Sequence, residues 1–381
     1  MTLPRTTARL LTPKSDLGGA LIETIDEAPP ASGDIWLRLD RFALTTNNIT
    51  YAAFGDAMRY WDFFPTGRDS HGHMPVWGFA DVVASTVEGI AVGERFYGYF
   101  PIRELVRMTP GRITPRGFYD VADHRLPLTS AYNQYTRCSQ DAAYDPALEN
   151  AQMLIRPLFI TSFVLADYLA DNGWFGASRL VVSSASSKTA YGAAFCLSAA
   201  RATGRIELIG LTSAGNRGFT EGLGLYDRVV TYDRLEDIAA DRPVLYVDFS
   251  GDDGLRARVH DHFGPALVHD CLVGSAANTA PLDQTLAHGA TLPGPAPVMF
   301  FAPVQIRKRN ADWGGAEFTR RFNIDQTAFI TRATTGAAPW MRIGEARGMD
   351  MAASLIRQLH DGTADPRVGH VIVLDQPASR L

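Results

Sequence analysis

The middle of the chain alternates short apolar segments with stretches of helical spacing, and this alternation constrains the fold more than any other feature. The apolar segments span residues 180–182, 206–213, 228–233, 243–251, 266–274 and 296–303. Segments that are apolar throughout, rather than at every second position, are typical of parallel strands covered by helices on both faces. The sequence therefore predicts an α/β fold with a doubly wound parallel sheet of the kind that binds nucleotides.

The N-terminal third has the pattern of antiparallel β-structure. Residues 34–44 alternate apolar and polar side chains, with Ile35 and Leu37 on one face, which predicts a half-buried strand. Further β-rich runs cover residues 76–90 and 95–108, and glycine-containing turns separate the runs. Short strands joined in this way predict a small antiparallel barrel.

Two other segments complete the domain organisation. Residues 47–65 are crowded with asparagine and aromatic residues and predict a loop with a short helix. The last stretch, from about residue 311, has one helical and one strand-like pattern, which is too little for a separate domain. We expect it to return to the first domain, so that residues 1–145 and 311–381 form one domain and residues 146–310 the other.

Composition and charge exclude several classes of protein. Hydrophobic residues make up 46% of the chain and charged residues 20%, so it is not mainly disordered. A formal net charge of -5 gives no general attraction to nucleic acid or anionic membrane. We see no apolar run that approaches the roughly 20 residues needed to span a bilayer. The three cysteines, Cys138, Cys196 and Cys271, are scattered, which fits reduced thiols in a cytoplasmic protein.

The turn after the first strand of the middle third carries the most chemistry. It consists of Ser183, Ser184, Ala185, Ser186, Ser187, Lys188 and Thr189. In a parallel βα unit this turn faces the pyrophosphate of a dinucleotide, which rests on the helix N-terminus. The usual three glycines are missing, but small residues still allow close approach and hydroxyls can bond phosphate oxygens. Lys188 is unfavourable to the helix dipole, so we expect it to face a bound anion; a solvated lysine is the alternative.

The end of the second strand bears on the choice of cofactor. No Asp or Glu follows residues 206–213, although an acidic residue there would bind the ribose 2′-hydroxyl of NAD. Ser213, Asn216 and Arg217 follow instead and suit the 2′-phosphate of NADP(H), while an ordinary polar loop would have the same composition. Tyr232, at the end of the third strand, can cover the adenine side.

Taken in order, these features resemble the medium-chain dehydrogenase/reductase superfamily, in particular its zinc-free branch of quinone oxidoreductases and enoyl reductases. Within that branch the chain is similar to the family called DUF2855, on the strings NNITYAAFGD, YWDFFP, PVWGFADVVAS, SASSKTA and FFAP. The resemblance implies a GroES-like β-barrel catalytic domain, residues 1–145 and 311–381, and a Rossmann cofactor-binding domain, residues 146–310. It also implies a homodimer joined through the edge of the Rossmann sheet.

The chain departs from the zinc-dependent relatives. They have Gly-His-Glu where this chain has Gly78, Phe79 and Ala80, and they carry a catalytic cysteine and a four-cysteine lobe that have no counterpart here. His71 and His73 have no cysteine beside them and make a poor zinc site. We therefore expect no metal, and reduction of an activated C=C bond or a quinone rather than zinc-assisted alcohol oxidation.

The resemblance also implies roles for single residues. Tyr51 stands where zinc-free relatives often have a tyrosine beside the nicotinamide; its phenol could donate a proton to a substrate carbonyl, or its ring could only pack on the cofactor. Asn47 and Asn48 could bond the cofactor or cap the local helix. The remaining implied positions are a substrate wall of Tyr60, Trp61, Phe63 and Phe64, and cofactor contacts from Thr161, Ser162, Gly274 and Phe301.

The sequence thus predicts a zinc-independent, NADPH-dependent reductase of a small enoyl, enone or quinone-like substrate. Two alternatives stay open, because the glycine fingerprint is eroded and no unambiguous acid or base is visible. The first is an NADPH-binding or sensing protein without turnover. The second is a lyase or hydratase on the same fold.

Overall fold

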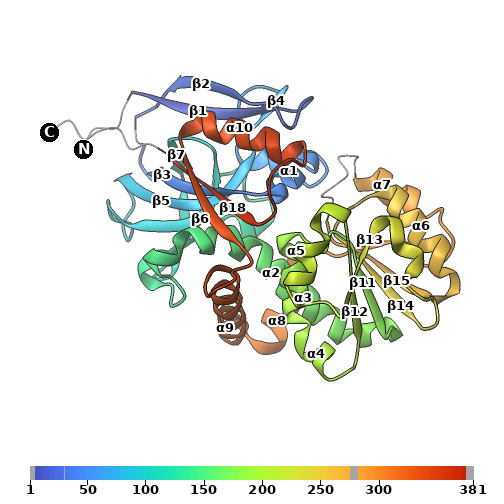
Figure 1. Cartoon of the computed structure of the whole chain (residues 1–381). Coiled ribbons are helices and arrows are strands. Elements are labelled where there is room, and N and C mark those ends of the chain that lie inside the picture. The colour runs from blue at the N-terminus through green and yellow to red at the C-terminus, as the bar shows by residue number, and fades with distance from the viewer. Residues whose placement is uncertain (1–4, 30, 275–281, 375–381) are drawn as a thin grey trace. The chain divides into compact units, whose positions relative to one another are not determined.

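The computed structural model describes residues 5–29, 31–274 and 282–374 and divides the chain into two compact units (Figure 1). Unit 1 comprises Met1–Leu154 and Met341–Leu381, and unit 2 comprises Ile155–Trp340. The sequence-based boundaries lay at residues 145/146 and 310/311. Most of the difference is the segment 311–340, which belongs to unit 2 here.

Unit 1 is rich in β-structure. Its strands are β1 (Thr6–Pro13), β2 (Leu21–Asp26), β3 (Ile35–Leu44), β4 (His71–Gly72), β5 (Pro75–Ser85), β6 (Arg95–Pro101), β7 (Leu105–Met108), β8 (Pro110–Thr114), β9 (Gly117–Asp120), β10 (Gln134–Arg137), β17 (Arg342–Arg347) and β18 (Val368–Val373). Its helices are α1 (Thr46–Ala53), α10 (Gly348–His360) and the 3-10 helices η1 (Tyr60–Phe63), η2 (Ser130–Tyr132), η3 (Cys138–Gln140) and η4 (Pro146–Leu148). Within the described residues, a mixed sheet runs in the order β17-β18-β3-β5-β6-β10-β9-β8, with β7 paired to β3, and β2-β1-β4 form a smaller sheet.

The core of unit 1 follows from the strand pattern seen in the sequence. Ile35, Leu37 and Leu39 of β3 are almost completely buried in one hydrophobic cluster. The C-terminal helix α10 joins the same cluster, because its apolar residues, including Ala352 and Ile356, recur every three to four positions on one face. The stretch from β17 to β18, residues 342–373, accordingly belongs to unit 1, where β18 pairs with β3.

Unit 2 is built on a parallel sheet. Its strands are β11 (Arg179–Val182), β12 (Glu207–Thr212), β13 (Arg228–Thr231), β14 (Val244–Asp248), β15 (Leu267–Leu272) and β16 (Val298–Met299). Its helices are α3 (Lys188–Cys196), α4 (Ser198–Ala202), α5 (Arg217–Gly222), α6 (Asp253–Phe263), α7 (Leu282–Gly289), α8 (Ala302–Trp313), α9 (Gly315–Thr334), and the 3-10 helices η5 (Gly173–Gly176), η6 (Ala214–Asn216), η7 (Tyr232–Asp237) and η8 (Gly264–Ala266). Helix α2 (Glu149–Asp171) begins in unit 1 and continues into unit 2.

The strand order of this sheet decides its type. The order is β13-β12-β11-β14-β15-β16, and every neighbouring pair is parallel. Counted from the first strand this is 3-2-1-4-5-6, the order of the dinucleotide-binding doubly wound fold, whose topological switch point lies between the first and fourth strands. All six predicted strands are present, so the predicted parallel sheet is confirmed.

Two helical regions differ from the sequence prediction. Helix α2 starts at Glu149 and includes Pro157, whereas the apolar residues at helical spacing in the sequence indicate a helix only over residues 160–173. The stretch 302–334 forms α8 and α9, which the sequence analysis did not predict. Charged residues alternate with the apolar residues of α9, so the helical repeat of its apolar positions is weak in the sequence. Its Phe322 and Phe329 nevertheless pack on Phe159 of α2.

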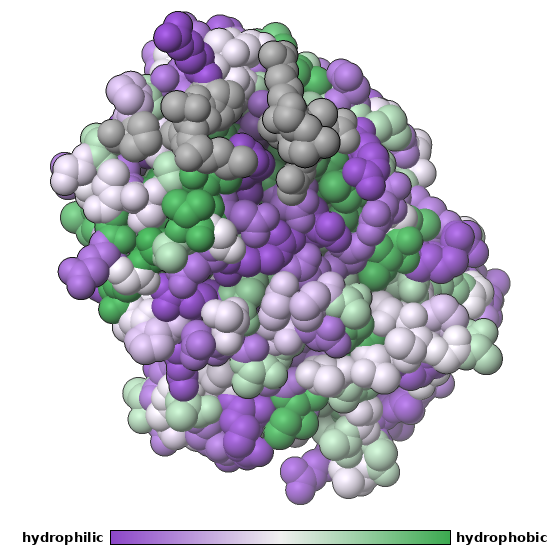
Figure 2. Space-filling model, turned by 90° about the vertical axis from the view of Figure 1, so that its left-hand side faces the viewer, coloured by the Kyte–Doolittle hydropathy of each residue, from purple (hydrophilic) through white to green (hydrophobic). Residues whose placement is uncertain are grey.

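Helix α2 also bears on the question of a membrane. Within the described residues, the segment 146–171 is long and apolar enough to cross a bilayer, contrary to the sequence analysis, which found no such run. Most of the segment is buried in the protein, as in the core helix of a soluble protein. On the face shown in Figure 2, hydrophobic side chains form separate patches between hydrophilic ones.

Candidate functional site

The turn after β11 contains a residue in an unfavourable backbone conformation. Ser184 has a φ of 46°, in the left-handed region that favours glycine. For a serine this conformation costs of the order of 1–3 kcal/mol, and it persists only where neighbouring groups hold it. Two bonds do so: the Ser184 amide donates to the Tyr232 hydroxyl at 3.1 Å, and the next amide, of Ala185, donates to the Leu211 carbonyl at 3.0 Å. The serine thus makes the tight turn that a glycine usually makes in dinucleotide-binding loops.

Helix α3 begins directly after this turn. Ser187 caps it, with its hydroxyl accepting from the Ala190 amide at 3.4 Å. Ser186 is buried beside Thr212, while Lys188 and Thr189 at the helix start are half-buried. The predicted phosphate-binding residues therefore lie around one helix N-terminus, where partial positive charge favours an anion.

Gly192, inside helix α3, has a packing role. A Cβ on Gly192 would lie 2.6 Å from Oγ of Ser162 on α2, so only glycine allows the two helices this close. Ser162 is completely buried, and its hydroxyl lies 2.8 Å from the Thr189 carbonyl, to which it donates. Close helix packing is one of the roles of a glycine in the usual fingerprint. Ser162 is thus bonded inside the protein, and its neighbour Thr161 is half-buried.

The residues expected near the 2′-phosphate follow β12. Ser213 and Arg217 are exposed, and Asn216 is half-buried in the loop between them. The Arg217 guanidinium forms an ion pair with Glu221, one helical turn on, with Nε and Oε1 2.8 Å apart. The pair is exposed to solvent, so its contribution to stability is small and Glu221 can be displaced by a stronger anionic partner.

The other predicted cofactor contacts follow neighbouring strands. Gly274 lies after β15, and its amide donates to the Asp248 carbonyl at 3.2 Å; a Cβ there would come within 3.1 Å of the Phe249 carbonyl. Phe301 is half-buried and precedes α8. Because the carboxyl ends of parallel strands meet at one edge of the sheet, the structure brings the turn, the β12 loop, Tyr232, Gly274 and Phe301 to the same edge of unit 2.

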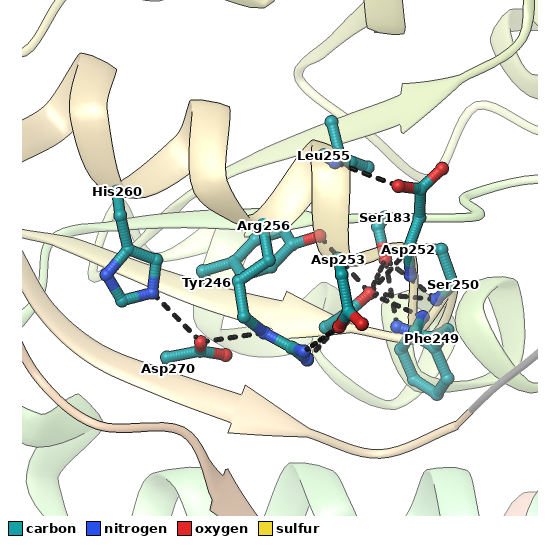
Figure 3. A network of polar contacts seen from close by, with 12 residues as sticks. Ser183, Tyr246, Phe249, Ser250, Asp252, Asp253, Leu255, Arg256, His260 and Asp270 are labelled. Carbon is teal, nitrogen blue, oxygen red and sulfur yellow. Dashed lines mark hydrogen bonds and ion pairs between the residues drawn. The ribbon is translucent and has the colours of Figure 1, made fainter. Parts of the chain in front are cut away.

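A buried polar network that the sequence analysis missed lies at the switch point of this sheet (Figure 3). At its centre is Asp248, the last residue of β14, which is completely buried. The Arg256 guanidinium on α6 donates to Asp248 Oδ2 at 2.5 Å and pairs with Asp270 of β15 at 3.0 Å. His260 of the same helix bonds the Asp270 carboxylate at 3.0 Å. An aspartate that ends an apolar run, followed eight residues later by an arginine, is the only signal of this network in the sequence.

Unit 1 contains a second set of predicted residues, around Tyr51. Its hydroxyl accepts a hydrogen bond from the Trp77 indole nitrogen at 3.1 Å. An indole N–H is a donor only, so the Tyr51 proton is left for another acceptor. Burial raises the pKa of Tyr51, and hydrogen bonds from Trp77, Asn47 and Tyr132 offset part of that effect. The phenol stays protonated at neutral pH and can therefore donate.

The two asparagines differ in their surroundings. Asn48 is buried and forms a capping box with Thr45: its Oδ1 accepts from the Thr45 amide at 2.8 Å. Its Nδ2 donates to the Pro75 carbonyl, also at 2.8 Å. Both ends of this side chain are occupied, which favours the capping role for Asn48. Asn47 is half-buried and contacts the Tyr51 hydroxyl.

The predicted substrate wall lies partly in the core. Trp61 belongs to the hydrophobic core, packed so closely on Gly55 and Gly72 that a Cβ on either would overlap its ring. Tyr60 and Phe63 are buried beside Tyr132, and Phe64 is half-buried. The rings of Tyr51 and Tyr60 lie 4.8 Å apart between centroids, so these two predicted residues do come together.

Three further aromatic residues complete this cluster: Trp77, Tyr99 and Tyr132. Tyr132 lies in the short 3-10 helix η2, a segment in which the apolar residues show no regular spacing. Its hydroxyl lies 3.3 Å from the Tyr60 hydroxyl. The buried Arg125 donates to the Tyr132 carbonyl at 2.9 Å. Tyr99 is fully buried with its hydroxyl unpartnered. Only folding brings these residues together, so no pattern in the sequence indicated them as a group.

His71 and His73, the two histidines considered as zinc ligands in the sequence, do not have the surroundings of a zinc ligand. His73 is buried between Arg9 and Arg103, and burial together with these charges lowers its pKa to about 3. His71 is half-buried and bonds Ser70. Within residues 5–29, 31–274 and 282–374, no three His, Cys, Asp or Glu side chains are grouped so that they could hold a metal ion.

Comparison with known families gives an identification. Residues 42–365 match the family described as "Protein of unknown function (DUF2855)". The chain belongs to this family. The DUF2855 resemblance predicted from the sequence is thereby confirmed. No curated protein sequence matches the chain.

Comparison with solved structures identifies the fold. CurA from Vibrio vulnificus in complex with NADPH is similar over 97% of this chain and 100% of its own, with a TM-score of 0.57 and 14% identity. CurK enoyl reductase covers 98% and 100%, with a TM-score of 0.55 and 12% identity. The quinone oxidoreductase from Coxiella burnetii covers 97% and 100%, with a TM-score of 0.51 and 12% identity. The predicted fold class, a GroES-like barrel domain with a Rossmann domain, is confirmed.

Proposed function

We propose that the chain is an NADPH-dependent reductase of an activated C=C bond or a quinone-like compound, and that it works without zinc. The observation that carries the proposal is the edge of the 3-2-1-4-5-6 sheet, where a strained turn of small residues meets a helix N-terminus. Its support from other proteins is that CurA of the same fold was crystallised with NADPH, and that CurK is named an enoyl reductase.

The residues of unit 2 fit such a cofactor. Ser184, Ser186 and Ser187 offer hydroxyls and amides around the start of α3, where a pyrophosphate would be held. Lys188 would add a positive charge, and Arg217 would exchange Glu221 for the 2′-phosphate. In this proposal unit 2 is the cofactor-binding domain and unit 1 the catalytic domain.

The residues of unit 1 would position the substrate and supply a proton. The bound cofactor supplies a hydride. When hydride adds to the β-carbon of an enone, negative charge develops on the carbonyl oxygen, and a donor aimed at that oxygen lowers the barrier. Tyr51 is suited to this role because the Trp77 indole can only donate to its oxygen, so the phenol keeps a proton that it can give to an acceptor. The aromatic rings of Tyr60 and Phe64 would contact a flat or acyl-like substrate.

The experiment is a turnover assay with purified protein. NADPH is mixed with a panel of quinones, enals and enoyl thioesters, and the nicotinamide absorbance is followed. Steady oxidation with one of them, unchanged by a metal chelator, supports the zinc-independent reductase. Tight NADPH binding without turnover would favour the sensing protein, and substrate conversion without net NADPH oxidation would favour a lyase or hydratase.

Two further proposals rest on the resemblance. We infer a cytoplasmic homodimer, and β16, the last strand in the sheet order, offers the edge for it. Val298 of this strand is exposed, which fits a contact surface. Sedimentation at micromolar concentration tests the dimer, and a stable monomer would contradict it.

A further inference from the structure

The carboxyl ends of β11 and β14, the two strands at the switch point, are joined by the hydroxyl of Ser183 in addition to the backbone bond from its amide to the Val247 carbonyl. Ser183, which follows β11, is completely buried. Its Oγ donates to Asp248 Oδ1 at 2.7 Å and accepts from the amides of Phe249 and Ser250 at 2.9 and 3.1 Å. The residue that begins the strained turn is thus fixed to the end of the neighbouring strand.

Asp248 can hold this serine because its own position is determined from several sides. Its Oδ1 also accepts from the Ser250 hydroxyl at 2.7 Å and from the Gly251 amide at 3.1 Å. Its Oδ2 is paired with the buried Arg256 guanidinium. A carboxylate bonded by so many donors has little freedom to rotate.

The next residue along the chain is Ser184, the serine with a φ of 46°. A glycine takes this conformation without cost, but a serine keeps it only if its neighbours hold both of its ends. Tyr232 holds the amide of Ser184, the bonds of Ser183 fix the residue before it, and the Ala185 amide, which donates to the Leu211 carbonyl, fixes the residue after it. The buried network therefore lies next to the one position of the turn where a serine stands in a conformation that favours glycine.

We propose that Ser183, Asp248 and Arg256 form a clamp that holds the turn at Ser184 in the conformation that binds NADPH. The three are positioning residues that need not touch the cofactor. The inference rests on the proposed function and deepens it, because it names what replaces the glycine fingerprint in cofactor binding.

The test uses three variants of the full chain and NADPH as the probe. Ser183→Ala removes the hydroxyl and leaves Asp248 paired with Arg256, so the fold is kept. Losing these buried hydrogen bonds should weaken NADPH binding by about tenfold or more. Ser184→Gly alone removes the penalty at positive φ together with the Ser184 hydroxyl, so it serves as the reference in which Ser183→Ala should no longer weaken NADPH binding. The double variant should recover most of the affinity that Ser183→Ala loses.

Ser198→Ala is the matched control. The Ser198 hydroxyl of unit 2 likewise makes a hydrogen bond inside the protein, donating to the Phe195 carbonyl at 2.7 Å, but it lies in a helix away from the turn. Its loss should lower the melting temperature slightly and leave the NADPH affinity unchanged. Rescue by Ser184→Gly is the decisive readout, since a general loss of stability would not be repaired by adding a flexible residue.

Amide hydrogen exchange tests the clamp without any cofactor. In Ser183→Ala the peptides that cover residues 183–188 and 248–251 should exchange faster, while those that cover β12 should not change. If exchange rises and NADPH affinity stays as in the wild type, the network is only structural and the inference is overturned. If the wild type binds no NADPH, the proposed function fails; unchanged exchange in Ser183→Ala would refute the clamp separately.

Discussion

Replacing Arg217 by alanine should weaken NADPH binding selectively. In the free protein its side chain is 56% exposed and paired with Glu221. Such an exposed pair is worth about 0.3–0.5 kcal/mol, whereas a charge-assisted bond to a phosphate is worth about 1.5–3 kcal/mol. The net gain on binding is therefore about 1–2.5 kcal/mol, which corresponds to roughly 5–70-fold in Kd. NADH has no 2′-phosphate, so its Kd should stay nearly the same.

The assay is a titration of the purified protein with each cofactor, followed by nicotinamide fluorescence. Arg320→Ala is a matched control, because Arg320 is an exposed arginine of unit 2 in a similar pair, with Glu317. Glu221→Gln should change the affinity in the opposite direction, since it frees Arg217, and tighten NADPH binding by a few-fold at most. Equal weakening of NADPH and NADH in Arg217→Ala, or no change in either, would refute the assignment of the 2′-phosphate site.

Three other changes have defined outcomes. Tyr51→Phe should reduce turnover at least about 100-fold and leave NADPH affinity unchanged, measured by steady-state kinetics; full activity would show that the ring only packs. Both nitrogens of His260 face acceptors. Burial lowers the pKa of His260, but its bonds to the Asp270 carboxylate and to a backbone carbonyl outweigh burial, so the pKa is raised above its usual value. Its stabilisation should thus be complete below about pH 6.5 and disappear as pH rises through the higher folded value, which urea unfolding from pH 6 to 9 measures and His260→Gln should abolish. Gly192→Ala should destabilise the protein by about 1–3 kcal/mol by overlap with Ser162, and Ser162→Ala should restore part of that loss; an unchanged melting temperature would contradict the packing argument.

The parallel sheet could be predicted from the sequence because its signal is local. Each strand is a continuous apolar segment, so it can be recognised in the sequence without knowing which strands lie beside it in the sheet. The turn at Ser184 was predictable for the same reason, since it directly follows a strand. Its φ was not, because nothing in a run of serines shows which one takes the left-handed conformation.

The groups that depend on contacts distant in the sequence were not predictable. Ser183 and Asp248 are 65 residues apart in the chain and meet only because β11 and β14 are neighbours in the sheet. Trp77 and Tyr132 join Tyr51 from a strand and a 3-10 helix. Aromatic residues in a loop gave an ambiguous signal: Trp61 is a core residue, while Phe64 is half-buried.

Binding of NADPH and NADH to the wild-type protein tests the central claim most directly. Isothermal titration calorimetry with each cofactor, without any substrate, measures both affinities and does not depend on knowing the reaction. The edge of the parallel sheet, with its turn at Ser184 and no acidic residue after β12, predicts that NADPH binds about tenfold or more tightly than NADH. Failure to bind either cofactor, or equal affinity for the two, would contradict the account.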